Sequence, residues 1–280
     1  MSDAKGEIKV LLNTHFSYQA PELSELVEAV AALYHSGTED WQACQVAYHD
    51  FRHVGQVTLL ALRLLAGCAR AGQQALCGPG AVRRLTAAAL LHDSGYLKRR
   101  GEAGGRGGEH SFDHVGRSEQ LAQHFLLQKG WVKEDCETVQ RLIGQTEIIH
   151  RPTPVMGELE SELASFLRTA DLLAQVAAVD YVERLPDLYD EFAEAYQAVG
   201  VELLRRRGVP VFESLAALVS SSASFMRQQV LPELKDMGCM DRCLPMFYGT
   251  VSTPYHRQLE ANLQRLERLE GEPPISSRSA

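Results

Sequence analysis

Apolar residues recur at spacings of three and four along most of the chain, which is the period of an amphipathic α-helix. We find no segment with the alternation of apolar and polar residues that is typical of a half-buried strand. The predicted helices span residues 21–36, 39–47, 53–73, 80–92, 112–129, 133–149, 157–182, 186–206, 211–235 and 254–270. The pattern therefore predicts an all-α protein of nine or ten helices.

The same pattern predicts one domain. Neither an internal repeat nor a clear linker divides the predicted helices. We expect an N-terminal segment over 1–20, a single helical domain over 21–270 and a disordered tail over 271–280. The Gly-rich stretch "KRRGEAGGRGGEH" (98–110) is predicted to be a mobile loop.

Composition and charge narrow the function classes. The chain has 280 residues and a formal net charge of −8, which disfavours binding to a nucleic acid polymer or an anionic membrane. It lacks an apolar run long enough for a transmembrane helix, and its first residues do not resemble a signal peptide. Six scattered cysteines suit reduced thiols. We therefore expect a cytoplasmic protein.

The candidate functional residues are ionisable side chains within or at the ends of apolar predicted helices. "YHDFRHVGQV" places His49 and His53 four positions apart at the start of a long apolar helix. "AALLHDSGY" ends an apolar helix in His92 and Asp93, and "SFLRTADLLAQV" puts Asp171 on the core side of its helix. Buried carboxylates and imidazoles are costly unless they are paired or bound to a metal ion.

Two further histidines extend this set. His114 stands in "FDHVGRSE", and His150 ends the helix "LIGQTEIIH". Neutral imidazoles and carboxylates are ligands for zinc, manganese, iron and magnesium, and no cysteine joins the cluster. A surface position for His114 or His150, and a structural hydrogen bond for His49, remain the alternatives.

The order His53, His92-Asp93, Asp171 on successive helices resembles the HD-domain superfamily of metal-dependent phosphohydrolases. "YHDFRH" is also similar to the His-Asn-x-x-His signature of cyclic-nucleotide phosphodiesterases, with Asp50 where those enzymes have Asn. The match covers about residues 45–180. It implies an HD-domain helical bundle with additional C-terminal helices, and a metal-site core within that range.

The resemblance also implies roles for the residues. His53, His92, Asp93 and Asp171 would hold a first divalent ion, with Asp93 bridging to a second. His114 and His150 would complete a binuclear site for Mn, Fe, Mg or Zn. His49 would be the general acid that protonates the leaving oxygen, with Asp93 as its catalytic partner at the ions.

By the same resemblance the substrate is a phosphodiester or phosphomonoester of a nucleotide or another small molecule. Arg117, one turn after His114, and Lys98, beside the Gly-rich loop, are the candidate phosphate contacts, although ordinary solvated charges would look the same. The chain departs from the (p)ppGpp hydrolases and the cyclic-di-GMP phosphodiesterases, since "HDSGYLKR" lacks the Glu-Asp pair and "HRPTP" replaces Gly-Tyr-Pro.

Two other readings stay open. Some HD-fold proteins with this ligand set hold a mixed-valent di-iron centre and cleave C–C or C–P bonds with O2. Others are non-catalytic signalling modules, which the complete predicted ligand set disfavours. A homo-oligomer is compatible with the sequence.

Overall fold

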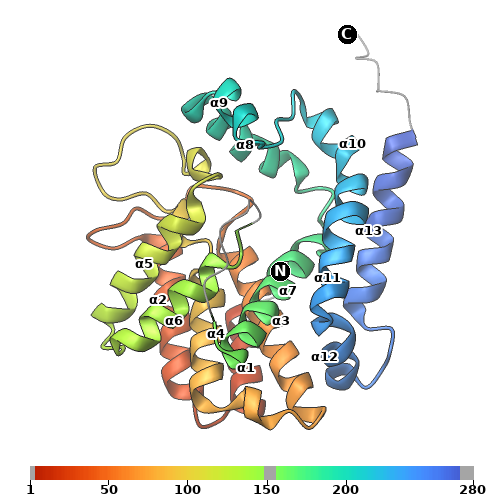
Figure 1. Ribbon diagram of the computed structural model, residues 1–280. Coiled ribbons are helices and arrows are strands. Elements are labelled where there is room, and N and C mark those ends of the chain that lie inside the picture. Colours follow the sequence, from red (N-terminus) through yellow and green to blue (C-terminus); the bar gives the residue numbers. More distant parts are fainter. Residues whose placement is uncertain (1–3, 148–155, 272–280) are drawn as a thin grey trace.

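The computed structural model describes residues 4–147 and 156–271. Within these ranges the chain forms helices and no strand, apart from one isolated antiparallel bridge between Trp41 and Arg99 (Figure 1). The predicted all-α fold is confirmed. None of the described helices combines the length and the apolar character needed to cross a membrane.

Helix α3 (Phe51–Arg70) is the centre of the bundle. Most of its residues are buried, and α1 (Ala4–His15), α4 (Pro79–Leu91), α7 (Glu158–Val176) and α12 (Cys239–Tyr248) all pack against it. A helix that is apolar on nearly every side is expected to be surrounded in this way. The Asp50 side chain caps its N-terminus by accepting a hydrogen bond from the backbone N–H of His53, with 3.0 Å between the heavy atoms.

Further helices cover α4 on its other sides. Helix α2 (Ala20–Ser36) packs against α1 and α4, while α5 (His114–Gln128) and α6 (Lys133–Gly144) pack against each other and against α4. Short 3-10 turns occur at η1 (Gln74–Cys77), η2 (Ser94–Tyr96) and η3 (Gly108–His110). Turn η2 lies against α5, so the end of α4 is held close to the start of α5.

The C-terminal helices form the rest of the structure. Helix α8 (Leu185–Val199) contacts η3 and is followed by the short α9 (Val201–Arg206). Helix α10 (Leu215–Phe225) continues through a π-helical turn (Met226–Val230) into α11 (Leu231–Met237), and α13 (Pro254–Gly271) lies beside α10 (Figure 1). Helix α8 also packs against α10.

The predicted helix over 39–47 is wrong, because this segment is extended. Its backbone N–H groups donate to distant carbonyls instead of to their own turn, as in Gln42 to Lys98 and Cys44 to Tyr34, each over 2.8 Å. Tertiary hydrogen bonds therefore override the local helical period.

Helices α1 and α12 were not predicted, and several predicted helices have different bounds. Residues 157–182 leave the helix after Val176, residues 186–206 divide at Gly200, and residues 211–235 become helical only from Leu215. Gly200 has a φ of 88°, a left-handed conformation that ends α8 without steric cost.

Candidate metal centre

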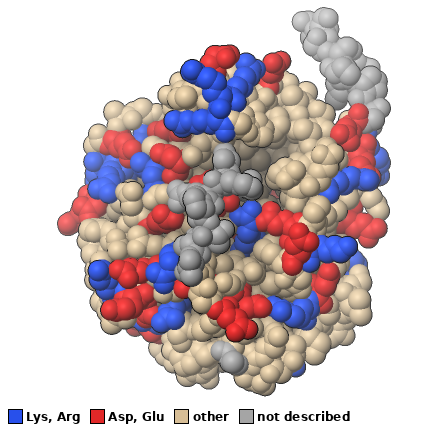
Figure 2. All heavy atoms as spheres, viewed as in Figure 1, with Lys and Arg blue, Asp and Glu red and all other residues tan. Residues whose placement is uncertain are grey.

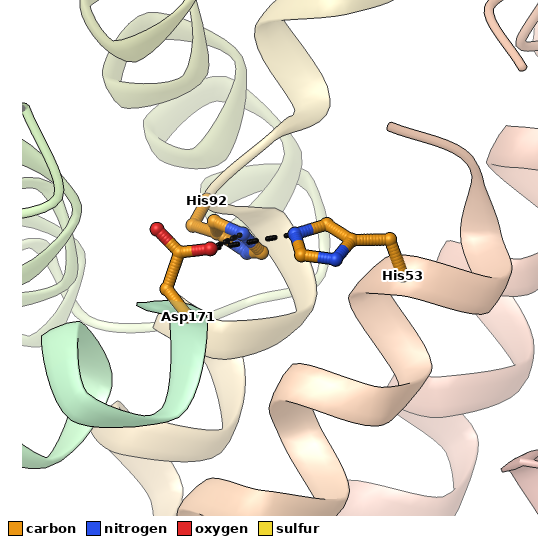
Figure 3. Close-up of side chains that lie close together, drawn as sticks. All are labelled: His53, His92 and Asp171. Atoms are coloured by element: carbon orange, nitrogen blue, oxygen red, sulfur yellow. Dashed lines mark ion pairs between the residues drawn. The ribbon is translucent and has the colours of Figure 1, made fainter. Parts of the chain in front are cut away.

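Three central helices bring the predicted ligands together. His53 lies in the first turn of α3, His92 and Asp93 directly follow α4, and Asp171 lies in α7. Helices α4 and α7 both pack against α3, and they also contact each other. The three side chains in Figure 3 consequently point toward one another from three different elements.

The ligand atoms converge on a small volume. One atom from each of His53, His92 and Asp171 lies within 4.8 Å of the others. Asp171 Oδ1 is 3.4 Å from His53 Nε2 and 3.5 Å from His92 Nε2. Asp93 Oδ2 is 3.2 Å from His53 Nε2 and 3.1 Å from His92 Nε2. Ligands about 2.0–2.2 Å from one ion are separated by roughly 3.0–3.5 Å.

Three of these atoms are buried and lack hydrogen bonds, whereas Asp171 Oδ1 accepts one from the Gln175 amide at 3.3 Å. His53 Nε2, His92 Nε2 and Asp93 Oδ2 have no hydrogen-bond partner among the described residues. The other ring nitrogen of His92, Nδ1, is oriented by the Ala89 carbonyl at 2.9 Å, so that its N–H donates there and Nε2 presents a lone pair. Such unpartnered atoms are costly in a protein interior unless a cation joins them. The buried group of His53, His92 and Asp171 can therefore hold a metal ion.

The electrostatics agree with this arrangement. Burial alone would lower the pKa of His53, but the nearby carboxylates of Asp171 and Asp93 outweigh it and raise that pKa. The pKa of His92 is raised well above its usual value in the same way, against the effect of burial. Burial would raise the pKa of Asp93, yet the neighbouring His92 and His53 hold it well below its usual range. Without an ion, protons on the imidazoles would supply the missing positive charge.

His114 extends the cluster on the far side of Asp93. Its Nε2 is 3.6 Å from Asp93 Oδ1, whereas the other oxygen of Asp93 faces His53 and His92. Nδ1 of His114 is 3.0 Å from the Ser111 carbonyl, to which it donates in the tautomer that leaves Nε2 as acceptor. Burial lowers the pKa of His114, which favours the neutral ring. Asp93 thus presents its two oxygens to two separate sets of imidazoles.

Gly95 allows α5 to approach this closely. A Cβ on Gly95 would lie 1.9 Å from the carbonyl oxygen of His114 and 2.8 Å from the backbone nitrogen of Ser118. The Gly95 N–H also donates to Ser118 Oγ at 2.8 Å. The φ of Gly95 is not positive, so the close contact with α5 is the reason for glycine at this position of η2.

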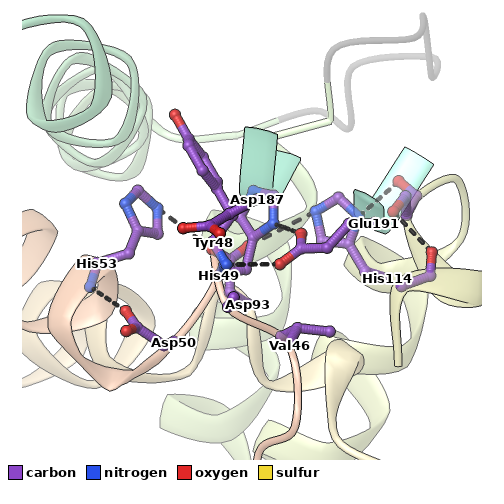
Figure 4. Close-up of polar contacts among 12 residues, drawn as sticks. Val46, Tyr48, His49, Asp50, His53, Asp93, His114, Asp187 and Glu191 are labelled. Carbon is purple, nitrogen blue, oxygen red and sulfur yellow. Dashed lines mark hydrogen bonds and ion pairs between the residues drawn. The ribbon is translucent and has the colours of Figure 1, made fainter. Parts of the chain in front are cut away.

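His49 stands beside the cluster and does not enter it. Its Nδ1 lies 2.5 Å from Glu191 Oε2, and Glu191 Oε1 accepts the backbone N–H groups of Tyr48 at 2.7 Å and of His49 at 3.2 Å (Figure 4). The His49 ring stacks on Tyr96 with centroids 4.4 Å apart and planes 8° apart, and Tyr96 in turn stacks on His114. Glu191 and Tyr96 therefore fix both the position and the ring plane of His49.

The sequence analysis missed Glu191. This residue belongs to α8, which carries several other acidic residues, so its identity alone is uninformative. Its position in the helix could have identified it. Glu191 lies one turn from the core-packed Leu188 and one turn from the buried Ala195, on the apolar face of α8. A carboxylate on the apolar face of a helix was the same signal that identified Asp171.

The structure directs Lys98 and Arg117 away from the cluster. The Lys98 ammonium is 4% exposed and donates to the carbonyls of Gly104 and Gly105. Arg117 donates to the Gly95 carbonyl at 2.8 Å and contacts the Glu102 carboxylate at 3.2 Å. Arg117 therefore links α5 to η2 and to the Gly-rich loop, while Lys98 makes its hydrogen bonds within that loop.

The remaining predicted ligand, His150, lies outside the described residues.

On the face shown in Figure 2 the surface is hollowed in the region between α7 and α8. The side chains of His49, Asp171 and His114 are 10%, 13% and 20% exposed, so the cluster is not sealed from solvent. A small molecule could thus reach Asp171 and His114, whereas His92 is fully buried.

No known protein-family model matches this chain, and no curated protein matches it either. The function must therefore be argued from the geometry and chemistry of the site.

Proposed function

We propose that this protein is a metal-dependent phosphohydrolase of the HD type, acting on a phosphate ester of a nucleotide or another small molecule. One observation carries the proposal. Buried imidazole and carboxylate atoms without hydrogen-bond partners converge at His53, His92 and Asp93, directly beside an imidazole held by a carboxylate. Metal-assisted hydrolysis of a phosphate ester uses a metal ion that activates water and a group that protonates the leaving oxygen. Metal ligands next to a positioned imidazole would provide for both.

The ions are divalent, and two are expected. His53, His92, Asp93 and Asp171 would hold the first, and Asp93, His114 and His150 would hold the second. The mixed nitrogen and oxygen donors suit manganese, iron, zinc or magnesium. The two oxygens of Asp93, which face different imidazoles, support its bridging role.

When bound, such ions activate water and neutralise the charge on phosphoryl oxygens. The leaving oxygen then needs a proton, and His49 is the residue placed to supply it. With the Nδ1–H hydrogen-bonded to Glu191, the ring would act as an acid only when doubly protonated, and the transferable proton would then be on Nε2. Tyr96 stacks on the His49 ring and fixes its plane.

The charge of the chain bears on how a phosphate substrate would be bound. The chain is acidic overall, so an anionic phosphate must be attracted by the ions rather than by the general surface. Lys98 and Arg117 have other contacts, and the proposal does not use them for phosphate binding. We expect a small cytoplasmic metabolite and neither a nucleic acid polymer nor a membrane lipid.

The test is hydrolysis of a panel of phosphomonoesters, cyclic nucleotides and dinucleotides with manganese, magnesium, zinc or ferrous iron. Asp93→Asn and Asp93→Ala remove a ligand, and Asp241→Ala is the matched control, because Asp241 is largely exposed on α12. Metal-dependent turnover that both Asp93 variants lose and the control keeps supports the proposal. No turnover of any ester, in protein that carries two irons, would contradict it and favour an O2-dependent di-iron oxygenase.

A further inference from the structure

The end of the Gly-rich loop lies between the two residues that fix His49. Gly107 precedes turn η3 and Gly108 begins it, and η3 packs against α8. A Cβ on Gly107 would lie 2.3 Å from the carbonyl oxygen of Tyr96, and a Cβ on Gly108 would lie 2.8 Å from the Cα of Glu191. The backbone of the loop therefore touches both the turn that carries Tyr96 and the helix that carries Glu191.

The two glycines serve this arrangement in different ways. Gly107 has a φ of 115°, a left-handed conformation that favours glycine, and its N–H donates to Glu109 Oε2 at 2.6 Å. Glu109 is itself 3.3 Å from the Lys98 ammonium. Gly108 has no positive φ, so its missing side chain serves the close approach to α8. The conformation of the loop end is therefore fixed from both sides.

Glu194 attaches this loop end to α8, one turn after Glu191. Its Oε2 accepts the backbone N–H of Arg106 at 2.9 Å and that of Gly108 at 3.1 Å. Its Oε1 accepts the Nε–H of Arg106 at 2.6 Å. Hydrogen bonds to a carboxylate are stronger than those between neutral groups, and two of these three donors belong to the backbone. Glu194 therefore holds the loop itself and not only an exposed arginine side chain.

Helix α8 depends on this contact for its position. It packs against η3, α9 and α10, and the contact with η3 is the most extensive of the three. Phe192 of α8 also stacks on Phe112, which follows η3, with centroids 5.9 Å apart and planes 13° apart. Within the described residues α8 has no comparable contact with α3, α4 or α7, which carry the predicted ligands. The loop is thus the main support that brings Glu191 to His49.

We propose that Gly108 and Glu194 are positioning residues for His49. They hold the Gly-rich loop against α8, an arrangement that we call the loop clamp, and they thereby set the distance between Glu191 and the His49 ring. Gly107 fixes the opposite side of the loop against Tyr96. The inference rests on the proposed function, in which His49 protonates the leaving oxygen. It gives the loop a role in orienting the proton donor rather than in covering the substrate.

Two variants loosen the loop clamp and two controls leave it intact. Glu194→Ala removes the acceptor of all three N–H groups, and Gly108→Ala places a methyl group against the backbone of Glu191. Glu213→Gln changes a side chain that is 84% exposed, and the Cβ of Gly80→Ala would have no contact closer than 3.8 Å. Steady-state kinetics of each variant are measured with an ester that the wild type hydrolyses.

We expect both clamp variants to lower kcat about tenfold and to leave KM within about twofold, because the proton donor and not substrate binding is disturbed. The controls should match the wild type. When Glu194→Ala is combined with Glu191→Gln, kcat should fall no further than in Glu191→Gln alone, because both changes act through the same pair. A double variant whose loss equals the product of the two single losses would overturn the proposal.

A second measurement needs no turnover. The proton between His49 Nδ1 and Glu191 is followed as a low-field imidazole signal in the ¹H NMR spectrum of protein loaded with diamagnetic zinc, and it is assigned by its absence in Glu191→Ala. We expect this signal to be lost in Glu194→Ala and Gly108→Ala and kept in both controls. If the wild type hydrolyses no ester, the proposed function fails and this signal alone decides on the loop clamp. Its retention in both clamp variants, or its absence from the wild type, would overturn the proposal.

Discussion

His49 and His53 lie one helical turn apart in sequence, yet their ring nitrogens have different partners. The His49 ring is paired with the Glu191 carboxylate, whereas His53 Nε2 faces Asp93 and Asp171 without a hydrogen bond. Their rings are nearly perpendicular, at 89°, with centroids 5.6 Å apart. Two imidazoles held in this way suit two tasks, proton transfer and metal binding.

Replacement of Glu191 tests the first task. Glu191→Gln keeps the size but removes the charge beside His49, so we expect kcat to fall roughly tenfold to a hundredfold. The metal content should not change, because the Glu191 carboxylate hydrogen-bonds to Tyr48 and His49, and neither of these is a predicted ligand. Steady-state kinetics and elemental analysis check this, with the exposed Glu202→Gln as control. An equal loss of bound metal would instead assign Glu191 a role in building the metal site.

Metal binding, the second task, is expected to depend on pH. The pKa of His53 and that of His92 are raised, so these rings keep their protons to higher pH than ordinary imidazoles, and a metal ion must displace those protons. Metal affinity should therefore be weakest in acid and rise with pH, by up to about tenfold per pH unit for each proton displaced, until the rings are neutral. Calorimetric titrations with manganese at pH 6, 7 and 8 measure this. A pH-independent affinity would show that neither imidazole is a ligand.

At the scale of elements, the site depends on how closely turn η2 approaches α5. Gly95 lies in this turn, and its backbone N–H is held by Ser118 of α5. Arg117 adds a hydrogen bond to the Gly95 carbonyl from the same helix. These contacts place His114 within reach of Asp93, so a change in the packing distance should act on the site.

A methyl group at Gly95 tests this dependence. Gly95→Ala would place a Cβ 1.9 Å from the His114 carbonyl oxygen, and we expect it to lower stability by roughly 1–3 kcal/mol. It should also weaken binding of the second ion, because His114 must shift. Gly80→Ala is the matched control, since its Cβ would have no contact closer than 3.8 Å. Thermal unfolding that is equal for the two variants would contradict the packing argument.

Some elements could be predicted from local sequence and others could not. The long helix that begins at Phe51 has an Asp cap and continuous apolar residues, so its period was clear. The segment 39–47 has a similar apolar spacing, but Gln42 and Cys44 donate their backbone hydrogen bonds to distant residues. Helix α1 has only 12 residues, and its apolar stripe is short. Contacts between distant segments decided these cases.

At the scale of the whole molecule, the candidate site joins parts of the chain that are far apart. Each contributing element supplies one or two side chains. These elements are the segment before α3, the start of α3, the end of α4, the start of α5, α7 and α8. The sequence predicted the ligands because buried His and Asp residues are unusual on apolar helices. It could not show that Lys98 and Arg117 bind the Gly-rich loop, because those contacts exist only in the folded chain.

Metal removal should therefore weaken the entire fold. An ion that binds only the folded state stabilises it by about 2.7 kcal/mol when its concentration is one hundred times Kd. We expect chelation to lower Tm by several degrees, and added manganese to restore it. Differential scanning calorimetry of the chelated and reloaded protein measures the shift. An unchanged Tm would argue that the cluster is a metal-free polar network.

The central claim is that His53, His92, Asp93 and Asp171 bind a divalent ion, and equilibrium dialysis against manganese tests it most directly. Asp171→Asn preserves the shape of the side chain but removes its charge, and Asp236→Asn on the surface of α11 is the control. The account predicts at least one tightly bound ion in the wild-type chain and the control, with affinity at least about tenfold weaker in Asp171→Asn. Equal metal binding by all three proteins, or none by the wild type, would contradict the account.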